Sequence, residues 1–148
     1  MTELISELYS KFSPSEWEEI ETSFKRVSDG ETPSIPVNGF NLRQLERLRS
    51  MHDSGEHILL GTEEAKRADI LEKELRNYLT EVFSENPAAH IYIIVSCLFL
   101  TFAVHEPMHP EELTHWVRKE NGGNTEYLCP ACNDSLTCSF CVCSRLEQ

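Results

Sequence analysis

Five of the six cysteines in this chain gather at its C-terminal end, where their spacing could support metal or thiol chemistry. Cys129 and Cys132 form one Cys-x-x-Cys pair, Cys138 and Cys141 form a second, and Cys143 follows. Each such pair lets two thiolates converge on one Zn²⁺ ion in tetrahedral geometry. The two pairs lie closer together than in most structural zinc modules, and no standard iron–sulfur spacing is matched. The alternatives are a disulfide or redox-active pair, and thiols packed in a small apolar cluster.

A second candidate is the segment HEPMH at residues 105–109, which has the letters of the H-E-x-x-H motif of zinc proteases. That motif needs one continuous helix, because its two histidines must lie one turn apart on the same face. Pro107 would remove a helical hydrogen bond and restrict the residue before it. We therefore expect the preceding helix to end near Val104, with His105 and His109 in the loop that follows.

Both candidates follow the most apolar stretch of the chain, residues 88–104, which only His90, Ser96 and Thr101 interrupt with polar side chains. A helix that is apolar on every face is either a core helix or a membrane span. The stretch is at the short limit for a span, and amphipathic segments that could wrap around it precede it. The pattern predicts a central core helix that begins at Asn86-Pro87, in which Cys97 acts as a small apolar side chain.

Four amphipathic helices are predicted before the central helix, over residues 3–12, 14–28, 41–53 and 62–84. Ser13 and Glu16 predict a capping box for the second helix. Asn41 is expected to open the third helix, with Gln44 three residues later, and Ser54-Gly55 to end it. The predicted inward-facing stripes are Leu4, Leu8 and Phe12; Trp17, Ile20, Phe24 and Val27; Leu42, Leu45, Leu48 and Met51; and Ala68, Leu71, Leu75, Tyr78 and Val82.

The predicted fold class is all-α, a helical domain around one buried central helix with a loop-rich, cysteine-containing C-terminal tail. A chain of 148 residues has the size of one domain. We expect a single domain over residues 1–148, with a helical core at 1–110 and a Cys-rich subdomain at 111–148. Asn121-Gly122-Gly123-Asn124 is read as a turn within that subdomain.

Acidic residues outnumber basic ones by 25 to 13, and the formal net charge is −12. Binding to nucleic acid or to a membrane surface is therefore not expected. The N-terminus carries acids where a secretory signal carries a basic region, which predicts a cytoplasmic protein. In that reducing compartment, crowded cysteines more often bind metal or do thiol chemistry than form disulfides. The charge identifies no partner, and a protein partner or a homo-oligomer is compatible with it.

Four motifs in the second half of the chain occur in a recognisable order: LTFAVHEPMHP, NGG, YLCP and CSFC. In this order and at these separations, they resemble the pattern of an uncharacterised archaeal family, the domain of unknown function 2115 family, also called uncharacterised protein family UPF 0305. The likeness covers about residues 87–143 and departs from the family pattern at EELTHWVRKE. The family has no assigned activity, so the resemblance implies positions and not a reaction.

The resemblance implies which thiols and imidazoles form the site. A set of three cysteines and one histidine completes a tetrahedral zinc site. Glu106, in the Glu-Pro match, is expected to orient the histidine ligand. Cys132, Cys143 and His105 are particular to this chain. The shared positions, and the predicted zinc ligands, are Cys129, Cys138, Cys141 and His109.

The leading hypothesis is a zinc-binding helical protein that acts as a binding or regulatory module. In this hypothesis structural zinc holds the C-terminal tail against the end of the central helix. An enzyme is the second hypothesis, with an open zinc position for water and Glu106 as general base. Four protein ligands would close the metal site, whereas three would leave it reactive. The third hypothesis is a thiol redox protein that uses Cys138 and Cys141.

Overall fold

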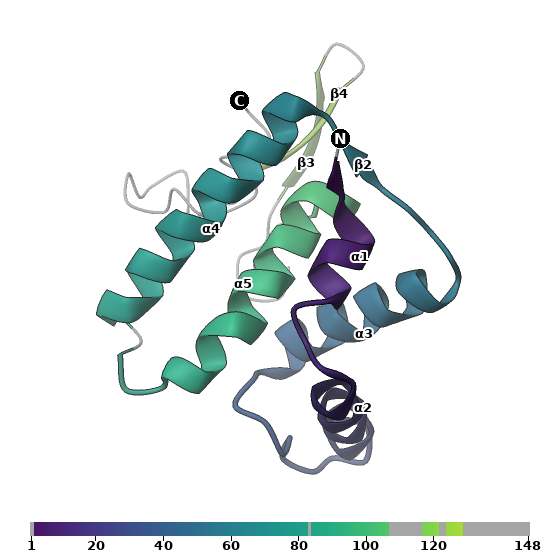
Figure 1. Cartoon of the computed structure of the whole chain (residues 1–148), viewed down its shortest axis with the longest axis vertical. Helices are drawn as coiled ribbons and strands as arrows, with labels where there is room; N and C mark the ends of the chain where they lie inside the picture. The colour runs from purple at the N-terminus through teal and green to yellow at the C-terminus, as the bar shows by residue number, and fades with distance from the viewer. Residues whose placement is uncertain (1, 83, 107–116, 122–123, 129–148) are drawn as a thin grey trace.

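The computed structural model describes residues 2–82, 84–106, 117–121 and 124–128. These residues form five α-helices and two pairs of short antiparallel strands (Figure 1). The core comes mainly from the helices, so the predicted all-α class is confirmed. The helices are α1 (Leu4–Tyr9), α2 (Pro14–Ser28), α3 (Gly39–Asp53), α4 (Thr62–Val82) and α5 (His90–Phe99), and the strands are β1 (Thr2–Glu3), β2 (Leu59–Leu60), β3 (Val117–Asn121) and β4 (Asn124–Leu128).

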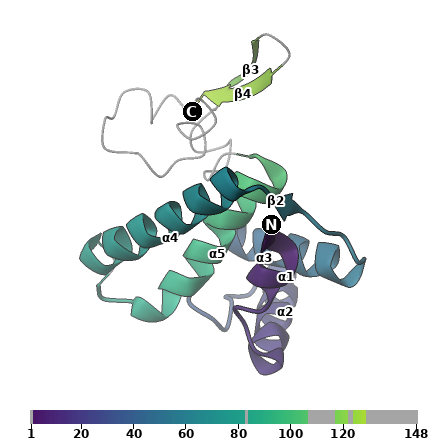
Figure 2. The same ribbon diagram turned by 45° about the horizontal axis from the view of Figure 1, so that its top comes forward.

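The segment predicted as the central helix lies in the middle of the helical assembly (Figures 1 and 2). It begins as a 3₁₀ turn, η1 (Pro87–Ala89), continues as α5 and ends as a π-helical turn, η2 (Leu100–Val104). α5 packs against both α3 and α4, and Val95 and Phe99 are fully buried. By length and composition alone Pro87–Val104 could cross a membrane, but 61% of it is buried inside the fold. The prediction of a buried central helix is confirmed.

The start of α2 follows the predicted capping box. The Ser13 hydroxyl accepts a hydrogen bond from the Glu16 amide at 3.2 Å, and the Glu16 carboxylate accepts one from the Ser13 amide at 2.9 Å. Trp17 and Ile20 then enter the core. These reciprocal bonds satisfy amides that the first turn of a helix leaves without partners. The helix ends at Ser28, as the sequence predicted.

α3 begins two residues before the predicted start, so the prediction that Asn41 opens it is wrong. Its N-cap is Asn38, whose side-chain oxygen accepts a hydrogen bond from the Asn41 amide at 2.7 Å. Val37 before the cap and Leu42 in the first turn are both buried in the core. An apolar pair in these two positions fixes the angle at which a chain enters a helix. Burial of Val37 therefore selects Asn38 over Asn41.

α4 presents a slightly different face to the core than the one predicted. Leu71 and Leu75 are buried as expected, but the next buried residue is Leu79 at 4% exposure, whereas Tyr78 is 43% exposed. Leu71, Leu75 and Leu79 follow one another at four-residue spacing and so lie on one face of the helix. Tyr78 lies about 100° around the helix from Leu79, so the prediction that it faces the core is wrong. α4 ends at Val82, two residues before the predicted end.

The two strand pairs were not predicted. β1 pairs with β2, which places Glu3 opposite Leu59, and β3 pairs with β4, with Asn121 opposite Asn124. In both pairs the strands are too short for an alternating apolar pattern to stand out from the sequence. β3 and β4 flank the predicted Gly-Gly turn.

Candidate functional site

The four predicted zinc ligands, His109, Cys129, Cys138 and Cys141, lie outside the residues that the structure describes. The same is true of the boundary between the predicted core and Cys-rich subdomain. Among the described residues, no group of three His, Cys, Asp or Glu side chains is arranged to hold a metal ion. The ligand set therefore stays a prediction. The described residues just before the first predicted ligand in the sequence form the exit of the central helix, residues 100–106.

The exit of the central helix is an unusual turn. The backbone amides of His105 and Glu106 both donate to the carbonyl of Leu100, the latter at 2.9 Å. His105 has φ 53° and ψ 51°, a left-handed conformation that it alone adopts among the described non-glycine residues. Such a conformation costs a side-chain-bearing residue about 1–2 kcal/mol. Backbone strain of this kind persists only where surrounding contacts hold it.

This turn decides how the HEPMH segment should be interpreted. The central helix ends at Val104, as predicted, and His105 leaves the helical region of backbone space. The prediction that the helix ends near Val104 is confirmed. Residues 107–109 of the HEPMH segment lie outside the described residues.

Glu106 is held against the core by Arg47 of α3. The two guanidinium nitrogens Nη1 and Nη2 of Arg47 donate to the two carboxylate oxygens of Glu106, at 3.1 and 2.7 Å. The two side chains are 38% and 40% exposed. A two-pronged arginine–carboxylate pair is both stronger and more directional than a single contact between charged groups. Glu106 therefore marks a defined point from which the chain leaves the helical core.

Arg47 is itself supported from two sides. Its Nη1 also donates to the side-chain oxygen of Gln44 at 2.8 Å, and the Gln44 amide donates to the carbonyl of Phe40 at 3.2 Å. Gln44 is only 2% exposed, so its hydrogen bond to Arg47 is almost completely shielded from water. The Arg47 guanidinium also lies 5.8 Å from the centre of the Phe99 ring, within range of a cation–π contact.

Arg47 carries no recognisable functional signal in the sequence, and Gln44 was predicted only as part of the start of α3. Both residues flank the leucine stripe of α3, three residues apart, where a polar side chain beside a core face is a weak signal of a buried contact. No pattern in the sequence links position 47 to position 106. The pairing depends on how α3 packs against α5, and that packing is a property of the folded chain.

Two hydroxyl groups of the central segment, those of Ser96 and Thr101, are buried in an otherwise apolar core. The Ser96 hydroxyl donates to the carbonyl of Tyr92 at 2.8 Å, and its oxygen also lies 3.2 Å from the carbonyl of Asn41 on α3. The hydroxyl of Thr101, in η2, is buried with no hydrogen-bond partner among the described residues. Cys97 is 8% exposed, as expected of a thiol packed as a small apolar group.

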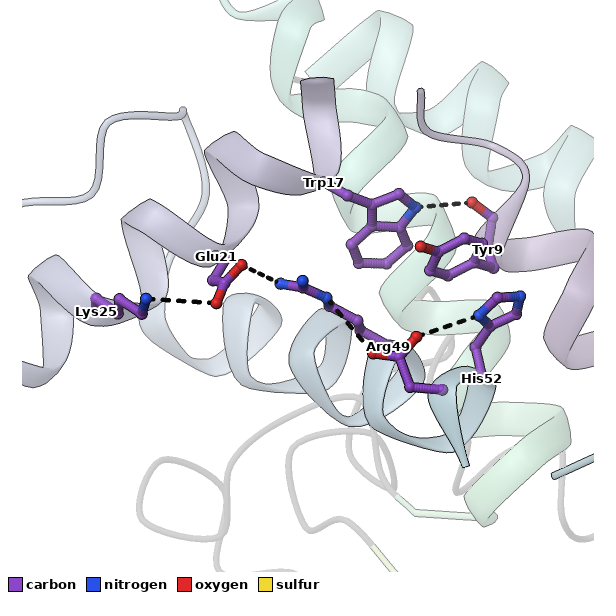
Figure 3. A network of polar contacts seen from close by, with 7 residues as sticks. Tyr9, Trp17, Glu21, Lys25, Arg49 and His52 are labelled. Atoms are coloured by element: carbon purple, nitrogen blue, oxygen red, sulfur yellow. Dashed lines mark hydrogen bonds and ion pairs between the residues drawn. The ribbon is translucent and has the colours of Figure 1, made fainter. Parts of the chain in front are cut away.

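A second polar network joins α2 to α3 (Figure 3). Arg49 donates to Glu21 at 2.7 Å, and Glu21 also lies 3.4 Å from the ammonium of Lys25. The Tyr9 ring stacks on His52 at the end of α3, with ring centres 3.6 Å apart. The hydrogen bond and charge of Arg49 lower the pKa of Glu21. The opposite charges of Arg49 and Glu21 neutralise each other across the interface between the two helices. The network therefore stabilises the packing of α2 against α3 and is not a reactive site.

Glu46, on the same face of α3, is the exception in this network. One of its carboxylate oxygens is buried and has no hydrogen-bond partner among the described residues. Burial raises the pKa of Glu46, and the charge of Arg49 acts in the opposite direction. The charges of Glu21 and Asp53 act in the same direction as burial, so Glu46 belongs to the same charged network between α2 and α3.

A small cavity of about 160 Å³ lies between α1 and α4. Leu4, Leu8 and Leu98 contribute apolar walls, and Lys11 and Glu72, 3.8 Å apart, lie at its charged edge. Ligand sites for drug-sized molecules usually measure several hundred Å³. This cavity is too small to hold an organic cofactor.

Comparisons with known proteins add no relative to this picture. No family model, no curated protein and no solved structure matches the chain. The resemblance to the domain of unknown function 2115 family therefore rests on the four motifs alone.

Proposed function

We propose that this chain is a zinc-binding helical protein of the domain of unknown function 2115 type, working in the cytoplasm as a binding or regulatory module. In this proposal Cys129, Cys138, Cys141 and His109 hold one structural zinc ion that fastens the C-terminal tail to the exit of the central helix. The observation that carries the proposal is the ligand chemistry, because three thiolates and one imidazole complete a closed tetrahedral site.

The geometry of the helix exit supports a structural role for the metal in preference to a catalytic one. The open-site alternative needs Glu106 as a general base beside a metal-bound water. Both carboxylate oxygens of Glu106 are bonded to Arg47. Glu106 thus holds the chain at the point where the tail begins, which is a structural role and not that of a general base.

The proposal is tested by elemental analysis of untagged protein purified without chelator. We expect about one zinc per chain in the wild-type protein, because four protein ligands form one closed site. Cys138→Ser removes a ligand and should lose most of the zinc. Cys143→Ser is the matched control, since it makes the same exchange in the same tail at a position outside the ligand set, and it should keep the metal.

One result would count against the proposal. Wild-type protein without zinc, whose thiols all titrate or form disulfides, would remove the zinc site and favour the redox alternative. Alkylation of the thiols across a range of pH would then decide that alternative, because a redox-active pair needs a thiol that reacts well below the pH at which ordinary cysteines ionise.

A further inference from the structure

The small cavity between α1 and α4 plays no part in the proposed zinc site. Its volume is about 160 Å³, and it has apolar walls and a charged edge. We propose that this cavity binds a small organic amine, an ammonium group carried by a hydrocarbon body of about six carbon atoms. The proposal is independent of the zinc site, because all residues that line the cavity lie between Leu4 and Leu98 in the sequence.

The cavity exists because α4 presents small side chains where it faces α1. The two helices flank α5 (Figures 1 and 2). One wall of the cavity comes from Leu4 and Leu8, which lie one turn apart on the same face of α1. The facing wall on α4 is formed by Ala65 and Ala68, and Leu98 of α5 also lines the cavity. The two alanines leave unfilled the space that larger side chains would occupy in a closely packed core.

The volume and the walls of the cavity fit a compact hydrocarbon. Leu4, Leu8 and Leu98 are 3%, 2% and 4% exposed, so their side chains are almost completely shielded from water. A cavity of about 150 Å³ with walls of this kind is large enough to hold a benzene molecule. A hydrocarbon that enters the cavity loses contact between its apolar surface and water, and this loss favours binding.

The charged edge of the cavity favours a cation. The Lys11 ammonium lies 3.8 Å from one carboxylate oxygen of Glu72, and Nε of Arg76 lies 3.5 Å from the other, so Glu72 is already paired. Glu7 and Asp69 also line the cavity, and among the described residues neither has an ion-pair partner. These two carboxylates would attract an ammonium group and repel a carboxylate. The net charge of −12 attracts cations to the whole chain as well.

The test compares three probes that share a six-carbon ring and differ in charge: benzylamine, benzyl alcohol and benzoate. Each is titrated into the full-length, isotope-labelled protein while the backbone amide chemical shifts are recorded. We expect saturable shifts at lining residues such as Leu8 and Ala68, with the tightest binding for benzylamine and the weakest for benzoate. Equal or tighter binding of the alcohol or of benzoate, or no saturable shift with benzylamine, would overturn the proposal.

Three variants locate the bound amine. Asp69→Asn removes one carboxylate from the edge and should weaken benzylamine binding by about two- to fivefold, as expected for one partly exposed charge pair. Glu63→Gln is the matched control, because Glu63 is an exposed acid of α4 that does not line the cavity, and it should bind benzylamine as the wild-type protein does.

Ala68→Leu fills the cavity and should abolish binding of benzylamine while the helical circular dichroism stays unchanged. Binding that persists in folded Ala68→Leu protein, or that is equal in Asp69→Asn and wild-type protein, would place the amine elsewhere and overturn the proposal.

Discussion

Glu3 shows how one carboxylate can tie the N-terminus to a distant part of the chain. It caps α1 by accepting hydrogen bonds from the amides of Ile5 and Ser6, at 2.9 and 2.8 Å. It also accepts the amide of Ile58 at 2.9 Å and lies 3.2 Å from the His57 ring. Partial burial acts to raise the pKa of Glu3, but these bonds outweigh it and lower the pKa to about 2.

Replacing Glu3 by Gln should therefore destabilise the protein in a pH-dependent way. The pKa of Glu3 is lower in the folded state than the ordinary value of 4.5, so its contribution is complete above about pH 4.5 and is lost as the pH falls towards 2. At pH 7 we expect a loss of about 1 kcal/mol in the free energy of unfolding, as for other lost N-caps. Urea unfolding at pH 7 and at pH 2.5 measures the difference.

Glu7→Gln is the control for this prediction, because Glu7 is an exposed acid in the first turn of the same helix. Its effect should stay within about 0.5 kcal/mol, as is usual for an exposed surface position. An equal loss for Glu3→Gln at both pH values would show that the charge of Glu3 does not carry the contact.

At the scale of the elements, α3 is capped by Asn38 and not by Asn41, the residue predicted to open the helix. Asn38→Ala should lower the free energy of unfolding by about 1 kcal/mol, because its side chain satisfies a first-turn amide. Asn41→Ala should have a much smaller effect, since Asn41 contributes its backbone amide to the cap. Thermal or urea unfolding of the two variants tests the assignment, and a larger loss for Asn41→Ala would move the cap from Asn38 to Asn41.

Local signals predicted the elements well where the signal is complete within a few residues. The Ser13 capping box, the leucine stripe of α3 and the end of the central helix at Val104 all follow from adjacent residues. The errors came where two local solutions were nearly equal, as for Asn38 and Asn41, or where one position around a helix decides burial, as for Tyr78 and Leu79. The π-helical form of residues 100–104 was not predicted, because no local pattern distinguishes it from an ordinary helical end.

The described helical core and the predicted metal ligands occupy different parts of the sequence. The described core consists of residues from 4 to 102, whereas the predicted ligands all follow it. Removal of zinc with a strong chelator should therefore leave the helical far-ultraviolet circular dichroism almost unchanged, while the tail thiols become reactive towards a thiol reagent. Loss of the helical signal in parallel with zinc release would contradict this separation and make the metal part of the core's stability.

The candidate site was predictable only as a set of residue types. Cys129, Cys138, Cys141 and His109 can be proposed from spacing and resemblance, because zinc ligation has a recognisable residue chemistry. The anchor that Arg47 provides was not predictable, because an arginine beside a leucine stripe has many possible partners. Its partner is identified only when α3 and α5 are packed side by side.

X-ray absorption spectroscopy at the zinc edge of the wild-type protein identifies the ligand atoms of the proposed site. We expect three sulfur atoms at about 2.3 Å and one nitrogen atom at about 2.0–2.1 Å. The His109→Ala variant should lose the nitrogen contribution. A shell of four sulfur atoms would contradict the assignment of His109, and an absence of bound zinc would contradict the zinc site altogether.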